Sequence, residues 1–366
     1  MALVVTVIIL LILAGVSINL VLGQNGLIAK AKEARDKSKN ATNDEAYLIN
    51  GTISDYIKDQ VGENDDNEIK RNGKIPSDGE YTIKATGTVL TGSNGDDFPE
   101  NPSAGDTYTE GDYIYTYNKG DGYGTEWCVK VNWDKEYYDD EGNFLDIDEI
   151  TEFGEIVSEI AGKPMTHMTE TFEDCWDLLI APKIPQSVTN MNYTFGWCHA
   201  LVEAPKIPNN VVNMEYTFSD CTDLSKAPEI PDSVTNMDGT FYQCESLIET
   251  PIIPESVTSL SQTFLYCKSL VDAPKIPKNV TNLKETFKGC SALKNAPEIP
   301  SSVTNMYGTF WNCISLTGSI TINANLDNYD DCFSGTTKPI TLTGTSTKLE
   351  DLKETVYPND HITILK

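Results

Sequence analysis

The sequence predicts an α/β solenoid of stacked 23-residue units, preceded by a long N-terminal hydrophobic α-helix and a small β-rich domain. Seven cysteines recur at intervals of 23 residues between Cys175 and Cys313. The stretch from Ala2 to Leu22 contains no charged residue. Between these regions, runs rich in Tyr, Thr, Ile and Val alternate with turn-forming residues, which is typical of strands. We therefore divide the 366-residue chain into 1–58, 59–149, 150–318 and 319–366.

The hydrophobic segment 2–22 is predicted to be a membrane-spanning helix. It is 21 residues long, and at ~1.5 Å per residue such a helix matches a hydrocarbon core about 30 Å thick. The alternative is a cleavable secretory signal, whose apolar stretch is ordinarily ~7–15 residues long and follows basic residues. Segment 2–22 is longer than that, and no Lys or Arg precedes it. We expect the helix to continue to about Lys58, with an interruption near Gly23–Gly26.

The run ALVVTVIILLILAGVSINLVLGQNGLIAKAKEAR, residues 2–35, resembles the N-terminal helix of type IV pilin-like proteins of Gram-positive anaerobes. The resemblance implies that the bulk of the protein lies outside the cell. It also implies that other pilin-like subunits are partners, in addition to the membrane. Two departures bear on filament assembly. The basic leader ending in glycine is not seen, as if Met1 were an internal start, and Ala2 aligns where many pilins carry glutamate. The lysines from Lys30 onward would by themselves favour a cytoplasmic flank.

Residues 59–149 are predicted to form an acidic β-rich spacer domain. From Asp59 to Lys163 there are 26 acidic and 8 basic residues. The expected strands lie within Glu80–Leu90, Asp106–Asn118 and Thr125–Trp133. The segment Glu136–Asp146 is expected to form a hairpin that turns near Glu141–Asn143. Its carboxylates would suit calcium, but their spacing does not fit an EF-hand loop. A short helix expected near Ile150–Ile160 would join the spacer to the solenoid and cap it.

The repeating unit is VTNMxxTFxxCxxLxxAPxIPxS. Seven units stay in register, which chance does not produce, and a fixed period of 20–50 residues indicates a solenoid. Equivalent positions in successive units should form columns of Phe, Cys and Leu in the core. These structural columns include Phe195, Cys198, Leu201, Phe218, Cys221, Leu224, Phe241, Cys244 and Leu247.

Each part of the unit carries its own prediction. The segment LxxAPxI is predicted to be the parallel strand, because proline disfavours a helix before it. The segment IPxSVTNM should turn the chain, with Ile184, Val188 and Met191 pointing inward. The segment TFxxCxxL is expected to be a helical turn, since its Phe, Cys and Leu would share one face.

The C-terminal segment 319–366 loses the 23-residue period and is expected to cap the solenoid. Strands are predicted at 320–325, 339–345 and 361–366. An amphipathic helix is predicted at Lys348–Val356. A Cys-Phe pair is kept at Cys332–Phe333.

The unit resembles the BspA-type leucine-rich repeat of bacterial surface proteins, whose pattern is similar to LxxIxIPxxVxxIGxxAFxxCxxL. Here Ala-Pro replaces a second large aliphatic residue, and Met-x-x-Thr-Phe replaces Ile-Gly-x-x-Ala-Phe. The resemblance covers about residues 160–320 and implies a right-handed leucine-rich-repeat-type solenoid. It also implies adhesion to, or contact with, a host or cell-surface protein or glycan.

The chain has nine cysteines, and their spacing favours core packing over chemistry. Free Cys is among the most buried residue types. Disulfides along the column would leave one of its seven members unpaired. Zinc is disfavoured because the sequence lacks a local CxxC pair and has only His167, His199 and His361. We expect buried free thiols, no metal and no cofactor.

Aromatic residues at variable positions beside the Phe column are the candidate ligand contacts, because Trp and Tyr are enriched at binding surfaces. The alternative is that they only cover the seams between units. The candidates are Tyr193, Trp197, Tyr216, Tyr242, Tyr266, Tyr307 and Trp311.

These features favour a binding role. No nucleophile elbow, HExxH, P-loop or Gly-rich nucleotide motif is found, so no catalytic residue is predicted. The net charge of −28 argues against nucleic acid, because phosphate binding depends on Lys and Arg. We expect a single-pass cell-surface protein for adhesion or for protein or glycan recognition. The alternative is a minor subunit of a type IV pilus-like filament that displays the solenoid.

Overall fold

The computed structural model describes residues 70–71, 80–83, 88–91, 102–117, 126–138, 144–160, 163–356 and 358–365. The chain forms two compact units, one of Met1–Asn67 with Glu136–Asp146 and one of Glu68–Lys135 with Ile147–Lys366. The predicted helix over 1–58, with its span at 2–22, lies outside the described residues. Within the described ranges, no helix has the length and apolar character needed to cross a bilayer.

The first unit contributes one described element, a small antiparallel hairpin. Strands β7 (Tyr137–Tyr138) and β8 (Phe144–Leu145) pair with each other. The rings of Tyr138 and Phe144 meet edge to face, with centroids 6.1 Å apart. The predicted hairpin is confirmed, and its turn lies outside the described residues.

The second unit begins with an eight-stranded sheet in the order β1-β9-β10-β6-β5-β4-β2-β3. All three segments predicted as strands in the spacer contain strands, but Glu80–Leu90 and Asp106–Asn118 each hold two antiparallel strands in place of one. In β5 and β6 the side chains alternate between buried and partly exposed. The strands are β1 (Lys70–Arg71), β2 (Glu80–Ile83), β3 (Thr88–Thr91), β4 (Thr107–Glu110), β5 (Tyr113–Tyr117), β6 (Trp127–Val131), β9 (Glu159–Ile160) and β10 (Lys163–His167).

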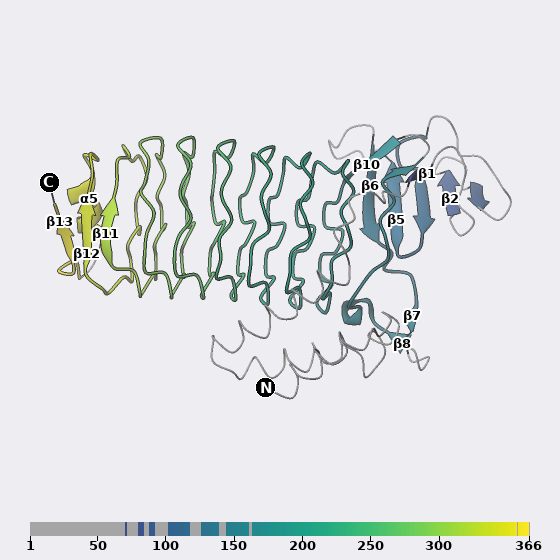
Figure 1. Ribbon diagram of the computed structural model, residues 1–366, viewed down its shortest axis with the longest axis horizontal. Coiled ribbons are helices and arrows are strands. Elements are labelled where there is room, and N and C mark those ends of the chain that lie inside the picture. Colours follow the sequence, from purple (N-terminus) through teal and green to yellow (C-terminus); the bar gives the residue numbers. More distant parts are fainter. Residues whose placement is uncertain are drawn as a thin grey trace, which may run out of the picture. The chain divides into compact units, whose positions relative to one another are not determined.

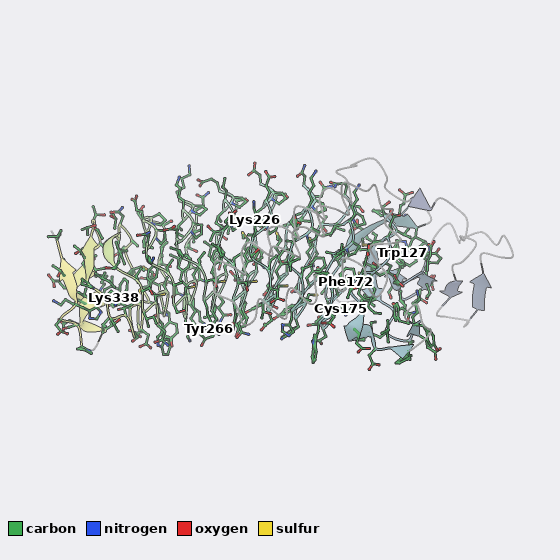
Figure 2. All side chains as sticks on the ribbon, turned by 60° about the horizontal axis from the view of Figure 1, so that its bottom comes forward. Trp127, Phe172, Cys175, Lys226, Tyr266 and Lys338 are labelled. Carbon is green, nitrogen blue, oxygen red and sulfur yellow. The ribbon has the colours of Figure 1, made fainter. Side chains whose placement is uncertain are left out.

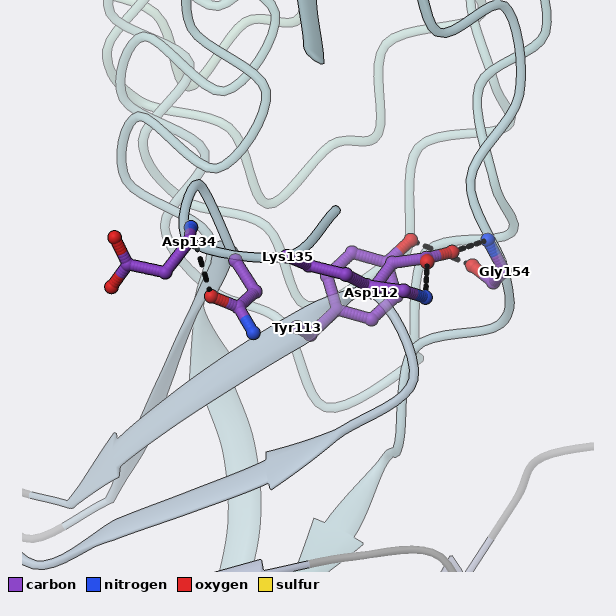
Figure 3. Close-up of polar contacts among 6 residues, drawn as sticks. Asp112, Tyr113, Asp134, Lys135 and Gly154 are labelled. Atoms are coloured by element: carbon purple, nitrogen blue, oxygen red, sulfur yellow. Dashed lines mark hydrogen bonds and ion pairs between the residues drawn. The ribbon is translucent and has the colours of Figure 1, made fainter. Parts of the chain in front are cut away.

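The helix expected near Ile150–Ile160 is wrong. After a 3-10 helix at Ile147–Glu149, the chain is irregular apart from one bridge at Glu152, and it then enters β9. Polar contacts from the β5 region hold it there (Figure 3). The amide of Gly154 donates to Asp112 at 2.6 Å, and the Tyr113 hydroxyl donates to the Gly154 carbonyl at 2.6 Å. These bonds to a distant part of the chain replace the bonds within the segment that a helix would need.

The segment nevertheless caps the first coil of the solenoid, as expected, where a coil is one 23-residue repeat. The Phe153 ring lies 5.5 Å from the Phe172 ring, and the Tyr113 ring meets the same phenylalanine edge to face at 6.0 Å. All three side chains are buried. Aromatic rings of the β-sheet domain therefore cover the open end of the Phe column.

The coils follow one another side by side between β10 and the C-terminal strands (Figure 1). A continuous ladder of parallel bridges runs through the coils, and each step in the ladder is 23 residues. It uses the Asn position of VTNM and begins in β10, so the sheet of the β domain continues into the solenoid. The ladder comprises His167, Asn190, Asn213, Asn236, Ser259, Asn282, Asn305 and Asn328.

The strand predicted in LxxAPxI is reduced to isolated parallel bridges in most units, such as Glu203 to Lys226 and Lys226 to Glu249. Among the described residues, a longer strand at this position is present only in the last unit, at Gly318–Thr321, which lacks the two prolines. The two prolines of the other units explain this, because neither has an N–H to donate to a ladder. The predicted turn at IPxSV is confirmed, and the Val188 amide donates to the Pro185 carbonyl at 3.1 Å. Ile184, Val188 and Met191 are buried, as predicted.

The helical turn expected in TFxxCxxL is also wrong. The arm from Met to Cys is a succession of turns in which every fourth residue is left-handed, for example Tyr193 (φ 51°) and Trp197 (φ 59°). Amides between these residues close local turns, as Gly196 does to Tyr193 at 3.1 Å. The amides of Met191, Tyr193, Phe195 and Trp197 instead donate to carbonyls of the next coil. A helix would use all of these amides for bonds within the arm. The described coils therefore contain no helix, and the α/β class needs correction for this part of the chain.

The core of the coils is a stack of phenylalanines. Consecutive ring centroids are 5.3–5.8 Å apart with interplanar angles of 2–10°. The Cys and Leu columns are buried beside it. Burial of one such side chain stabilises by about 1.5–3 kcal/mol. The stacked rings are Phe172, Phe195, Phe218, Phe241, Phe264, Phe287, Phe310 and Phe333.

Two polar columns tie each coil to the one before it. The hydroxyl of Thr217 donates to the Met191 carbonyl at 2.8 Å, and the thiol of Cys221 donates to the Phe195 carbonyl at 3.2 Å. The same two bonds recur along the stack over 26 residues. These threonines have no exposed surface. A buried hydroxyl needs such a partner, which explains why a Thr precedes each Phe.

The C-terminal cap agrees with its predicted elements. Strands β11 (Gly318–Thr321), β12 (Ile340–Thr343) and β13 (Ile362–Ile364) form a parallel sheet, and helix α5 spans Leu349–Glu354. Gly318 pairs with Ile340 and Ile340 with Ile362, so the period is not lost but shortens to 22 residues.

The last coil exchanges two columns. Phe333 stacks on Phe310, which places Cys332 in the Thr column and Thr336 in the Cys column. Cys332 is therefore not a member of the Cys column, although both residues are buried. Thr and Cys substitute for each other because each offers one donor on a short side chain.

Thr217→Val tests the bond between coils. We expect it to lower the free energy of unfolding by about 1 kcal/mol, because a buried hydrogen bond is lost at nearly constant volume. Thr235→Val is the matched control. Its hydroxyl is exposed and lies 3.4 Å from its acceptor, so we expect a loss below about 0.5 kcal/mol. Thermal melting compares them, and equal losses would contradict the assigned role.

Candidate functional site

The arm surface is the outward side of the Met-to-Cys arms. It consists of four columns per coil, namely the two residues after Met and the two residues after Phe. All seven predicted contact residues belong to these columns, and all are partly exposed. Figure 2 shows one of them, Tyr266, at the opposite edge of the stack from Lys226.

Four of these residues form an aromatic cluster near the first coils: Tyr193, Trp197, Tyr216 and Tyr242. The rings of Tyr193 and Tyr216 are stacked, with centroids 4.8 Å apart. Trp197 is nearly parallel to Tyr193 at 6.1 Å, and Tyr242 is tilted against Tyr216 at 6.1 Å. The structure thus gathers predicted contacts from three successive coils.

Tyr216 also spans the next coil. Its hydroxyl donates to Gln262, two coils away, at 2.5 Å. Gly239 lies between them, and a Cβ at that position would fall 2.3–2.6 Å from the Tyr216 ring. The Tyr266 ring lies over Gly289 in the same way. Tyr216 and Tyr266 therefore each lie over the seam to the next coil.

A charged network continues along the arm surface from Gln262. Gln262 donates to Glu285 at 2.9 Å, and Lys288 forms an ion pair with Glu285 at 2.5 Å. The Lys288 ammonium lies 4.1 Å from the centroid of the Trp311 ring. Burial opposes ionisation of Glu285, but the bonds from Lys288 and Gln262 outweigh it and lower the pKa of this carboxyl. Trp311 thus has a cation over its ring. The backbone amide of Tyr307 donates to the Asn305 side-chain oxygen at 3.0 Å.

Carboxylates surround the aromatic cluster. Burial, followed by the charges of Glu215, Glu173 and Glu170, raises the pKa of Tyr193. Burial together with neighbouring tyrosines and acids raises the pKa of Tyr216 to about 12. In the described part of the chain, neither Glu173 nor Glu215 forms an ion pair. The cluster is therefore neutral, aromatic and bordered by unpaired negative charge.

Sequence reasoning missed the residues that frame the cluster. Ser219 is buried between these coils, and its hydroxyl has no hydrogen-bond partner in the described structure. Glu173, Glu215 and Gln262 occupy arm columns that vary from unit to unit. A column-by-column comparison of the units would have placed them beside the tyrosines. The contacts between the aromatic residues, however, depend on the left-handed residues of the arm, which were not predicted from the sequence.

The Cys column offers no chemistry. Its seven thiols are buried, and six of them donate to carbonyls of the preceding coil. Burial raises the pKa of the Cys221 and Cys244 thiols well above the ordinary value, which disfavours the reactive thiolate. Across the described ranges, no group of three His, Cys, Asp or Glu side chains is arranged to hold a metal.

Thiol titration tests this assignment. We expect nine reactive thiols in denaturant without reductant, and slow reaction of the eight buried ones in the native protein. Because folding raises the thiol pKa, raising the pH from about 7 to about 9 ionises mainly unfolded chains. The free energy of unfolding should therefore decline as the pH rises above about 8.5. Fewer than nine thiols in denaturant, or rapid native labelling of the column, would contradict it.

Gly239→Ala tests the packing of Tyr216. We expect a loss of about 1–3 kcal/mol, since Gly239 has a φ of 63° and the new methyl group would overlap the ring. Gly196→Ala is the control, because a Cβ there has its nearest neighbours at 3.4–3.5 Å. Thermal unfolding of both variants is the measurement. Similar stability of the two variants would mean that Tyr216 does not lie over Gly239.

Comparisons with known proteins bear on the repeats. A family model described as "BspA type Leucine rich repeat region (6 copies)" matches residues 168–294 and 262–365. No curated protein sequence matches the chain. A crystal structure of a leucine-rich repeat protein from Bacteroides ovatus is similar at 22% identity, with a TM-score of 0.42, over 70% of this chain and 76% of that one.

Proposed function

Because the chain belongs to the BspA type leucine-rich repeat family, we propose that it is a cell-surface recognition protein that binds a host or cell-surface macromolecule through its solenoid. The observation that carries the proposal is the aromatic cluster. It presents partly exposed Tyr and Trp rings on coils that are fixed by core stacking and by bonds between coils. Rigid aromatic side chains lose little entropy on binding, which suits them to contact surfaces. The role is one of binding, since the sequence contains no catalytic motif.

Membrane anchoring is part of the proposal. It rests on the uncharged 21-residue segment 2–22, which is long enough to span a bilayer. The acidic β-sheet domain would then hold the solenoid away from the membrane as a spacer. The net charge of −28 favours a soluble, self-repelling exterior.

A second candidate is a minor subunit of a pilus-like filament that displays the solenoid. The observation in its favour is the pilin-like run at residues 2–35. Fractionation of native cells and imaging with an antibody to the solenoid separates the candidates. Label in the envelope supports the anchored receptor, label along filaments supports the subunit, and cytosolic label contradicts both.

Replacement of Trp197 and Tyr242 tests the binding role. We choose Trp197→Asn with Tyr242→Ser, because Asn312 and Ser219 occupy the same columns in other coils. We expect the double variant to bind host cells or matrix at least about tenfold more weakly than the wild type. Its melting temperature should change by less than about 3 °C. A melting temperature that falls together with the binding would show that these residues serve only packing.

A further inference from the structure

We propose that the aromatic cluster binds lysine or arginine side chains of a basic segment in a protein partner. This inference rests on the proposed recognition function and names the chemistry of its partner. It draws on three observations: a cation held internally on the same surface, a position where that cation is replaced, and unpaired carboxylates around the rings.

The internal cation is Lys288. Its ammonium lies 4.1 Å from the centroid of Trp311 in the next coil and forms an ion pair with Glu285 at 2.5 Å. An ammonium over an aromatic face is attracted by the ring quadrupole, and a carboxylate beside it adds charge. The arm surface therefore provides a ring of one coil and an acid of its neighbour as a seat for a cation.

Part of this seat recurs three coils earlier, without its cation and without its acid. Tyr242 occupies the column of Trp311, Ser219 that of Lys288 and Tyr216 that of Glu285. Ser219 is 1% exposed, and its hydroxyl has no partner in the described structure. The ring position is thus kept, whereas the ammonium of Lys288 is replaced by a short side chain. An ammonium from a partner would take the place beside Tyr242 that Lys288 takes beside Trp311.

The charge around this seat is suited to such a donor. The Tyr193 amide donates to the Glu215 carbonyl at 3.0 Å, and the Asp220 amide donates to the Tyr242 carbonyl at 2.7 Å, so both acids belong to arms that contact the cluster residues. The charge of Glu173 also acts on Tyr193. Of these carboxylates, Asp220 accepts a hydrogen bond from Gln243, whereas Glu173 and Glu215 form no ion pair within the described residues. A lysine or arginine at the cluster would gain both ring and carboxylate contacts.

A neutral glycan fits less well. A sugar ring needs a broad free aromatic face, but Tyr193 already shares a face with Tyr216 at 4.8 Å. The unpaired carboxylates would also gain no ionic partner from a neutral sugar. Charge complementarity therefore favours a basic polypeptide.

Binding of a fluorescent decalysine peptide to the full chain, followed by anisotropy, is the test. We expect saturable binding that weakens as the salt concentration rises from about 50 to about 500 mM, and no binding of a neutral Gly-Ser peptide of equal length. Two variants separate the contributions. Glu173→Gln with Glu215→Gln and, separately, Trp197→Asn with Tyr242→Ser should each raise the Kd about fivefold to twentyfold.

Glu229→Gln with Glu255→Gln is the matched control. It removes the same charge from exposed positions outside the arm surface, and we expect less than a twofold change in Kd. Ser219→Lys should weaken peptide binding, because its own ammonium would take the seat. Equal effects of the control and the Glu173/Glu215 pair, or unaltered binding by the Ser219 variant, would overturn the proposal.

The cell-binding assay separates this inference from the recognition function. If the chain binds cells and decalysine competes, both proposals are supported. Cell binding that is insensitive to decalysine and to the Glu173/Glu215 changes, but is lost with Trp197 and Tyr242, would point to a glycan and overturn only the basic partner. Absence of cell binding with intact decalysine binding would contradict recognition of those cells and leave the seat for cations supported.

Discussion

The hydrogen bonds that run from one coil to the next are the constraint on which the rest of the structure depends. Each arm has two sets of backbone groups to satisfy inside a dry stack. The amide of Phe195 donates forward to Thr217, while the Phe195 carbonyl accepts from the local Cys198 amide and from the Cys221 thiol of the next coil. Thr and Cys side chains thus give a second donor to carbonyls that already close turns. With these backbone groups of the arm paired, the Phe rings can stack without leaving an unpaired backbone donor or acceptor beside them.

The same backbone arrangement creates the arm surface. Left-handed residues at every fourth position turn their side chains outward, and neighbouring coils bring those side chains close together. Where the left-handed position is Gly239, a ring from the preceding coil lies over it, and where it is Glu285, an ion pair forms. The core columns are therefore uniform, whereas the arm columns alternate between aromatic, charged and glycine residues. The surface can differ from coil to coil while the stack that supports it does not change.

Much of the fold could be predicted because it depends on strict periodicity. The 23-residue step and the inward Phe, Cys and Leu columns follow from residue patterns that keep one position per coil. The three cap strands follow instead from local runs of β-forming residues in a segment that does not keep the 23-residue period. The errors arose where local patterns compete with contacts between coils. Phe195 and Cys198 have helical spacing, but their amides are used differently, one toward the next coil and one within the arm. The segment near Phe153 was expected to be helical, yet Asp112 and Tyr113 hold it in an irregular conformation through bonds across more than 40 residues. The predicted aromatic residues all lie on the arm surface, but their grouping with Glu173, Glu215 and Ser219 required the geometry of the arm.

Amide hydrogen exchange along the coils tests the central claim most directly. If the bonds between coils hold the solenoid together, the amides of Met191, Tyr193, Phe195 and Trp197 and their equivalents should be strongly protected throughout residues 168–317, including the middle of the stack. Exposed amides that make no such bond should exchange much faster in the same coils. Protection confined to the β-sheet domain and the C-terminal cap, with rapid exchange of the arm amides in the middle coils, would contradict the account.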